Sequence, residues 1–445
     1  MKNSRRASGF RAVLCFLVTG ALLTGLLVLS TLIPRETVAP RMQISADYLC
    51  EGELFGEAVK GVSSSRIDRY ADSILLGIAW QYDGRNAFRS VMESAYYHLP
   101  YQNENENLRD AVQRDLPANQ QYLRYWHGSA GIVRALMTFL TLPQIYLWHG
   151  ILMGILFLSL LFRLLRRRYT VPAAALTAGL VGSAFWLVPL SLEYTWVFLL
   201  LLLQLHVILA RRFPEDWSDR CLFFLVSGML ANYLDFLTCE TLTVLPGLIL
   251  LLWLDRKKGL PLPEWKTLGK VLAFWLAGYA GMYLLKWGLA ALAMGKNVMP
   301  YVAEHIEERT VGSTGAGFAG TYLGAVLRNI LNLFPMNFDT AGVLAGIALA
   351  VAAAYLGYVY HRNDFDRRAV MYWAALGLVP YLRYLALANH SYLHAFFTFR
   401  AQLATLLAAG LILGEVTGWG ESRGGSSLSR SRRGSEGRPG RHPSR

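Results

Sequence analysis

A chain of 445 residues that is 54% hydrophobic and only 16% charged does not have the composition of a soluble domain, in which about a quarter of the residues are charged. Apolar runs long enough to cross a bilayer recur along the sequence, and none shows the short alternation of barrel strands, so we expect an all-α polytopic membrane protein. The formal net charge of +13 gathers beside these runs, which favours contact with anionic membrane lipids and argues against nucleic-acid binding.

The N-terminal segment, residues 1–33, predicts the orientation of the chain. Several Lys and Arg residues precede an apolar run at 12–33. Because cytoplasmic flanks of membrane helices are rich in cations, we expect a cytoplasmic N-terminus. The run is longer than a signal core and no small-residue cleavage pattern follows it, so it is interpreted as the first transmembrane helix.

Residues 34–144 form a predicted extracytoplasmic loop domain, organised around residues 66–80, RIDRYADSILLGIAW. As a helix, this stretch has an apolar stripe, and Asp68 and Asp72, four positions apart, project from a neighbouring face. The stretch is too short and too polar to cross a bilayer but apolar enough to lie on one. We therefore expect an amphipathic helix with paired acids at the outer membrane surface.

The rest of this loop domain is less regular in sequence. A second apolar and polar piece lies at residues 88–98, and residues 101–121 are rich in Asn, Gln and Glu. We interpret the latter as a surface loop.

Residues 145–413 are expected to form a multi-span transmembrane domain that brings the total to about ten spans. Arg and Lys clusters follow alternate runs, which predicts cytoplasmic ends there and a cytoplasmic C-terminus. A second outer loop is expected at 295–340, and the tail at 414–445, rich in Gly, Ser and Arg, is expected to be disordered. The predicted spans after the first are residues 145–162, 172–190, 194–210, 221–233, 242–254, 271–294, 341–360, 370–387 and 397–413.

Asp68 and Asp72 are the candidate catalytic residues. A carboxylate at the membrane surface can take a proton from an acceptor hydroxyl that attacks an activated sugar carbon. Within such a pair one pKa is usually raised and the other lowered. The alternative is a solvated acidic face with Arg66 and Arg69 as surface partners, since exposed ion pairs are common and weak.

Residues 122–134, YLRYWHGSAGIVR, place Arg124, His127 and Arg134 among aromatic residues just before a span. Guanidinium groups there can hold the phosphate of a lipid-linked substrate, and His127 can donate a hydrogen bond or carry a proton. The alternative is an aromatic belt at the headgroup level with snorkelling arginines.

Three further acids, Glu193, Asp235 and Glu240, lie at the predicted outer ends of spans. Charges at membrane depth are costly and tend to face a cavity, so we expect these three to line one. The alternative is a short polar turn at the interface.

The last predicted outer loop, NHSYLHAFFTFR at residues 389–400, contributes His394 and Arg400 as candidate binding groups for phosphate or carboxylate. His390 and His394 are four apart, as two ligands on one helix would be, but no Cys or Glu-x-x-His pattern supports them. We therefore predict no metal site, and a requirement for a divalent cation stays open.

At these residues the chain resembles the GT-C superfamily of membrane glycosyltransferases. The sequence IDRYAD, residues 67–72, is similar to the Asp-Glu-x-x-Tyr-Ala motif of the protein-mannosyltransferase and lipid-A-aminoarabinose-transferase branches. Asp68 matches the first acid, but Arg69 replaces the second and the Tyr comes two positions early. The sequences RYWHG at 124–128 and HSYLHAFFTFR at 390–400 also resemble uncharacterised bacterial multi-span proteins of similar layout. The resemblance implies a polyprenyl-phosphate-linked sugar donor, Asp68 as base, and a place in the bacterial plasma membrane.

The resulting hypothesis is an integral-membrane glycosyltransferase acting on an extracytoplasmic acceptor. One rival is a transporter or lipid flippase, which Lys286, Arg383 and the short runs between 221 and 254 would favour. A polysaccharide polymerase or ligase is another, although its large outer loop would be expected late in the chain. A scaffold without enzyme activity is the fourth alternative.

Overall fold

The computed structural model describes residues 2–312, 314–333 and 340–419, and within those ranges every regular element is helical, with no strand beyond two isolated bridges. The predicted all-α class is therefore confirmed for the described residues. The α-helices are α1 (Lys2–Ser30), α2 (Arg35–Cys50), α3 (Arg69–Gln81), α4 (Ala87–Glu93), α5 (Glu104–Gln113), α6 (Gly128–Leu136), α7 (Leu142–Arg166), α8 (Thr170–Gly182), α9 (Leu192–Ile208), α10 (Trp217–Leu234), α11 (Leu245–Lys257), α12 (Trp265–Met294), α13 (Met299–Val311), α14 (Gly317–Leu331), α15 (Thr340–Val359), α16 (Arg367–Ala386), α17 (Ala388–Leu393), α18 (Ala395–Thr398) and α19 (Leu403–Thr417). The 3₁₀ helices are η1 (Ser63–Ser65), η2 (Gly84–Asn86), η3 (Phe185–Leu190), η4 (Glu240–Thr243) and η5 (Phe399–Gln402).

Four helical stretches are long and apolar enough to cross a membrane, which marks the chain as a membrane protein by length and composition. They are Gly9–Ser30, Leu142–Arg166, Trp265–Met294 and Ala395–Thr417. Three shorter apolar helices, Thr170–Gly182, Leu192–Ile208 and Leu344–Val359, accompany them. At about 1.5 Å per residue these are shorter than the roughly 30 Å hydrocarbon core, so they reach the spanning length only with flanking residues.

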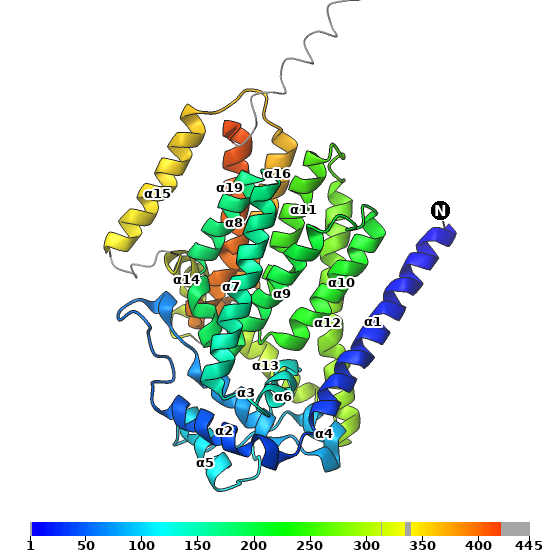
Figure 1. The fold of residues 1–445 in the computed structure, drawn as a ribbon, viewed down its shortest axis with the longest axis vertical. Coiled ribbons are helices and arrows are strands. Elements are labelled where there is room, and N and C mark those ends of the chain that lie inside the picture. The colour runs from blue at the N-terminus through cyan, green and yellow to red at the C-terminus, as the bar shows by residue number, and fades with distance from the viewer. Residues whose placement is uncertain (1, 313, 334–339, 420–445) are drawn as a thin grey trace, which may run out of the picture.

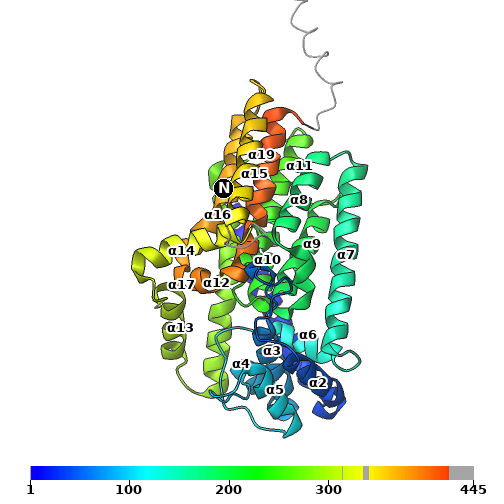
Figure 2. The same ribbon diagram turned by 90° about the vertical axis from the view of Figure 1, so that its left-hand side faces the viewer.

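The long helices stand side by side as a bundle, and a layer of short helices covers one end of it (Figures 1 and 2). We call this covering part, α2 to α6 at residues 35–136, the end layer. In Figure 1, α1 runs along one edge of the bundle, and α15 stands apart from the other helices. The end layer thus corresponds to the predicted loop domain at 34–144 and is mostly helical.

Helix α3 lies inside the end layer rather than on a surface. It packs against α2 and α5 on one side and against α6 and α9 on the other, so every residue from Asp72 to Trp80 is buried. Ser73 donates a hydrogen bond of 2.6 Å to the side chain of Asn105 on α5, which shows how the polar face is covered. This differs from the predicted amphipathic helix over 66–80: α3 begins at Arg69, and both of its faces are occupied.

The predicted surface loop at 101–121 is wrong over its central part, where α5 forms. The Asn103 side chain accepts a hydrogen bond of 3.1 Å from the Glu106 amide, and the Glu106 carboxylate accepts one of 3.2 Å from the Asn103 amide. This reciprocal capping box satisfies two amides that a helix start would otherwise leave without partners. The Asn-x-x-Glu spacing was visible in the sequence.

The predicted outer loop at 295–340 contains two helices, α13 and α14, although residues 313 and 334–339 lie outside the described part. The predicted tail at 414–445 begins later than expected, because α19 continues to Thr417. Residues 420–445 lie outside the described residues.

Candidate functional site

A cavity of about 380 Å³ lies where the end layer meets the bundle, between α3, α9, α13 and α17. We call it the polar cavity. Five of the sequence-predicted site residues line it, together with three ionisable groups that were not proposed for this role. The five are Asp68, Arg124, His127, Glu193 and His394, and the three are Glu308, Arg309 and His390. The remaining predicted residues, Asp72, Arg134, Arg400, Asp235 and Glu240, do not line it.

The acidic wall of the cavity is a pair of buried carboxyl groups, Asp68 and Glu193, which are 3% and 6% exposed. Asp68 is the N-cap of α3 and accepts a hydrogen bond of 2.8 Å from the Ala71 amide. Its carboxyl group also shares a hydrogen bond with the carboxyl group of Glu193, which requires a proton on one of the two.

Burial raises the pKa of Asp68 to about 6, although hydrogen bonds from the Ala71 amide and Glu193 and the charge of Arg400 act in the opposite direction. The pair therefore holds one proton and one negative charge near neutral pH. A carboxylate in this state can accept a proton from a bound hydroxyl group.

Asp72 lies one turn further along α3 and has a different role. Its carboxylate accepts hydrogen bonds from the Tyr146 hydroxyl, from the Ser191 hydroxyl at 3.2 Å and from the Leu192 amide at 2.9 Å. Leu192 is the first residue of α9, so Asp72 supplies an acceptor for a helix N-terminus from a distant part of the chain. Asp72 thereby fixes the position of Glu193, the next residue, against Asp68.

Two arginines form the basic wall. The Arg124 guanidinium lies 4.1 Å from the centre of the Tyr122 ring, and its Nη1 lies 3.2 Å from Nε2 of His305. Arg309 comes from α13 on the other side. The Nε atoms of both arginines are buried without a hydrogen-bond partner in the described ranges, and neither guanidinium forms an ion pair there. Two guanidinium groups with free donors suit a bound anion such as a phosphate.

The three histidines are neutral hydrogen-bonding groups. Burial, followed by the charges of neighbouring cations, lowers the pKa of His127 and brings that of His394 to about 4. His127 contacts the Tyr122 carbonyl through Nε2 at 3.0 Å, and His390 contacts the Leu237 carbonyl through Nε2 at 2.8 Å. The Nδ1 atoms of His127 and His390 are buried without a partner among the described residues, so they are available to a ligand. No group of three potential metal ligands occurs in the described ranges.

Arg400 and Arg134 are buried and do not line the cavity. Arg400 lies 4.3 Å from the centre of the Tyr194 ring and donates to the Phe396 carbonyl at 3.1 Å. Its positive charge lowers the pKa of Asp68. Arg134 donates to the carbonyls of Ala79 and Ile33, which joins α6 to the end of α3 and to the segment after α1.

The other predicted acids are held by their own partners. Asp235 accepts hydrogen bonds from the amide and the hydroxyl of Thr238, and Glu240 forms a buried ion pair of 3.0 Å with Arg383. Lys286, which together with Arg383 was the sequence feature in favour of a transporter, donates hydrogen bonds to two oxygens of the end layer. Lys286 therefore joins α12 to the end layer, whereas the partners of Asp235 and Glu240 lie within the bundle.

A second cavity of about 280 Å³ adjoins the polar cavity and has an aromatic lining that includes Tyr279, Tyr283 and Trp287. Arg124, Tyr125 and Arg309 line both spaces. The lining of this second cavity also includes Glu240, so this predicted acid lines a cavity, although not the polar one. The two arginines lie between the polar cavity and a space lined mostly by aromatic and aliphatic side chains.

Sequence reasoning missed Glu308 and Arg309 because the region at 295–340 was interpreted as a loop. The signal was present: Pro300 at the start of a helix-forming run that includes EHIEER at 304–309. His390 was considered only as a metal ligand.

Comparison with known proteins yields no relative: no family model, no curated protein and no solved structure matches the chain. The function is therefore inferred from the geometry of the site.

Proposed function

We propose that this chain is an integral-membrane glycosyltransferase that moves a sugar from a polyprenyl-phosphate-linked donor to an extracytoplasmic acceptor. The observation that supports the proposal most is that the Asp68–Glu193 carboxyl pair and the two arginines Arg124 and Arg309 face one cavity. A base on one wall and an anion-binding group on the other are the two requirements for displacing a sugar from a phosphate.

The donor fits the two adjoining cavities. Its sugar would occupy the polar cavity, its phosphate would lie between Arg124 and Arg309, and the first prenyl units would contact the rings of the aromatic cavity. The neutral imidazoles of His127 and His390 donate through Nε2 to backbone carbonyls, so their free Nδ1 atoms would accept hydrogen bonds from the sugar hydroxyls.

The proposed reaction is a single displacement. Asp68 takes the proton of the acceptor hydroxyl while its oxygen bonds to the anomeric carbon of the sugar. The bond from that carbon to the phosphate oxygen breaks, and the electron pair stays on the phosphate. Arg124 and Arg309 stabilise the additional negative charge. The anomeric configuration inverts because the acceptor attacks opposite the leaving group.

The proposal includes the topology of about ten spans, with the end layer outside the bacterial plasma membrane and both termini in the cytoplasm. The four candidate spans and three shorter apolar helices support it in part. The basic residues at the ends of α7 and α11, opposite the end layer, agree with a cytoplasmic side there.

The experiment is a transfer assay with the full chain in liposomes. The donors are polyprenyl-phosphate hexoses and pentoses with a tritiated sugar, and the acceptor is a bacterial envelope extract. Wild-type protein and the Asp115→Asn variant, which changes an exposed acid of the end layer, are expected to consume one donor. Asp68→Asn is expected to leave it intact. Transfer by Asp68→Asn at the wild-type rate would overturn the proposal, and so would the absence of transfer by the wild type with every donor.

A further inference from the structure

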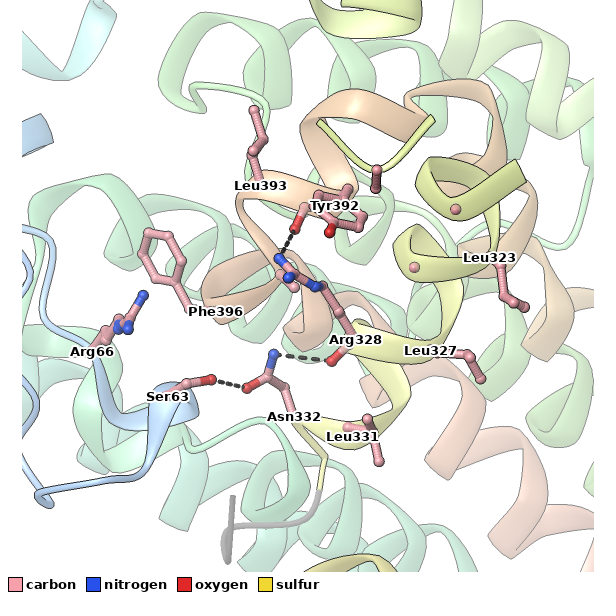
Figure 3. Close-up of a pocket in the computed structure, with 14 residues that line it drawn as sticks. Ser63, Arg66, Leu323, Leu327, Arg328, Leu331, Asn332, Tyr392, Leu393 and Phe396 are labelled. Carbon is pink, nitrogen blue, oxygen red and sulfur yellow. Dashed lines mark hydrogen bonds between the residues drawn. The ribbon is translucent and has the colours of Figure 1, made fainter. Parts of the chain in front are cut away.

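A groove of about 680 Å³ lies behind the polar cavity, between η1 on one side and α14 with the segment 392–396 on the other (Figure 3). We call it the lateral groove. Neighbouring residues of one short segment separate the two spaces: Tyr392 and Phe396 face the groove, whereas His394 and Phe397 line the cavity. None of the groups used in the proposed transfer lies in the groove.

Arg328 of α14 is held in the groove by stacking. Its guanidinium lies 3.9 Å from the centre of the Tyr392 ring, and Nη1 donates to the Tyr392 carbonyl at 3.3 Å (Figure 3). Gly324 permits this arrangement, because a Cβ atom there would collide with the Tyr392 ring. Arg328 forms no ion pair within the described part of the chain. A stacked guanidinium keeps its remaining N–H groups oriented for an anionic oxygen.

Arg66 enters the same groove from the opposite side and lies 5.6 Å from the centre of the Phe396 ring (Figure 3). Within the described residues Arg66 pairs with one acid, Glu57, whose carboxylate lies 3.4 Å from Nε, and the Arg66 side chain is 40% exposed. A hydrogen bond of 2.5 Å from Ser63 to Asn332 joins the two sides below the cations. The groove therefore contains two guanidinium groups, one on each side, and its two sides are joined by the hydrogen bond between Ser63 and Asn332.

The outer part of the groove is apolar. Leu323 and Leu327 of α14 are 61% and 46% exposed, and Phe318, one and a half turns earlier, is 77% exposed. A soluble anion would use the arginines and leave these side chains in water. An amphiphile would use both, because its phosphate would meet the cations and its chains would cover the leucines.

We propose that the lateral groove binds an anionic glycerophospholipid of the surrounding membrane, with its phosphate between Arg66 and Arg328 and its acyl chains on Leu323 and Leu327. Charge complementarity identifies the headgroup, since two cations face it and one carboxylate partly compensates them. The bound lipid would also support the 392–397 segment, which forms a wall of the polar cavity. This site is independent of the glycosyl transfer proposed above.

The test is native mass spectrometry of the full-length protein with three probes: phosphatidylglycerol, phosphatidylcholine with the same acyl chains, and glycerol phosphate, which has no chains. The wild type is expected to retain one phosphatidylglycerol about ten-fold more tightly than phosphatidylcholine, because a favourable pair of charge contacts is worth at least that factor. Glycerol phosphate is expected not to bind at the same concentrations.

The variants Arg66→Gln and Arg328→Gln are expected to lose the preference for phosphatidylglycerol. The double change Leu323→Ser and Leu327→Ser should weaken both lipids equally, and Arg89→Gln, which alters an exposed arginine of the end layer, should change neither. If Arg328→Gln fails to fold, Arg66→Gln decides the question, because Arg66 is 40% exposed and its ion pair with Glu57 is only partly buried. Equal retention of the two lipids by the wild type, an unchanged preference in Arg66→Gln, or tight binding of glycerol phosphate would each overturn the proposal.

Discussion

Asp68 and Asp72 belong to one segment but differ in their hydrogen-bond partners and in their access to the polar cavity. Asp72 accepts three hydrogen bonds from groups on α7 and at the start of α9, and it does not line the polar cavity. Asp68 accepts one from its own helix, shares a proton with Glu193 and faces an open space. The two are almost equally buried, so burial does not distinguish them.

The difference between the two acids lies in the hydrogen-bond donors that surround each carboxyl group. The fixed donors hold the Asp72 carboxyl group in one position, but burial still raises its pKa to about 7 against the hydrogen bonds from Tyr146, Leu192 and Ser191. Both acids of the segment therefore have raised pKa values, in place of the expected pair with one raised and one lowered. A carboxylate with one donor and a partner acid retains an acceptor site for a substrate. We therefore expect substitutions at the two positions to affect different measurements.

The largest effect is expected from Asp68→Asn. The value of kcat should fall by about 10²- to 10⁴-fold, because the general base is lost. The melting temperature should change little, since Asn also caps a helix start and can accept from the Ala71 amide. Asp68→Ser, which keeps a cap without a base, serves as the second variant. A large fall in melting temperature with unchanged kcat would reverse the assignment of the two acids.

The next effect is expected from Arg124→Gln and Arg309→Gln. Each removes a charged donor from the proposed phosphate site, so KM for the donor should rise by about 10- to 100-fold. Arg134→Gln is the matched comparison, because that guanidinium binds carbonyls away from the cavity and should affect stability instead. An unchanged KM in both cavity variants would remove the phosphate from this site.

Asp72→Asn should destabilise the protein by about 1–3 kcal/mol, because an amide cannot accept from Tyr146, Ser191 and Leu192 together. The measurement is the midpoint of denaturant unfolding in detergent, with Asp115→Asn as the exposed control. The variant that folds should retain most of its kcat. Loss of kcat without loss of stability would show that Asp72 takes part in the chemistry.

The smallest effect concerns pH. The raised pKa of Asp68, about 6, means that its carboxylate is mostly ionised at pH 7 and mostly protonated at pH 5. Since the base must be ionised in the protein that meets the substrate, kcat/KM should fall by about ten-fold between those two pH values. A carboxyl group with its ordinary pKa would keep nearly full activity over that range. A flat profile down to pH 5 would therefore count against Asp68 as the base.

The sequence predicted the helical class and five of the residues around the cavity because charged and aromatic groups are rare in an apolar chain and stand out. It did not predict the pairing of Asp68 with Glu193. The four-residue spacing suggested that Asp72 is the partner of Asp68. Because α3 begins at Arg69, however, Asp68 precedes the helix as its N-cap, and its carboxyl group lies against Glu193 of α9. That shift depends on tertiary packing, which no local pattern contains.

Arg309 was missed for a related reason. Its helix, α13, lies in a stretch with few apolar residues, and its proximity to Arg124 arises only when the chain folds back over more than 180 positions. Contacts of that separation cannot be read from spacing. The helix α5, in contrast, could have been predicted from its capping box.

The hydrogen bond from the Leu192 amide to Asp72 has a consequence for how the protein is made. The two residues are 120 positions apart, and α7 and α8 are synthesised between them. Asp72 is therefore synthesised well before Leu192, and the hydrogen bond between α3 and the start of α9 forms only after α9 has been made. Completion of this wall of the polar cavity is thus coupled to the synthesis of α9, because a nascent chain without α9 lacks both Glu193 and the amide from which Asp72 accepts.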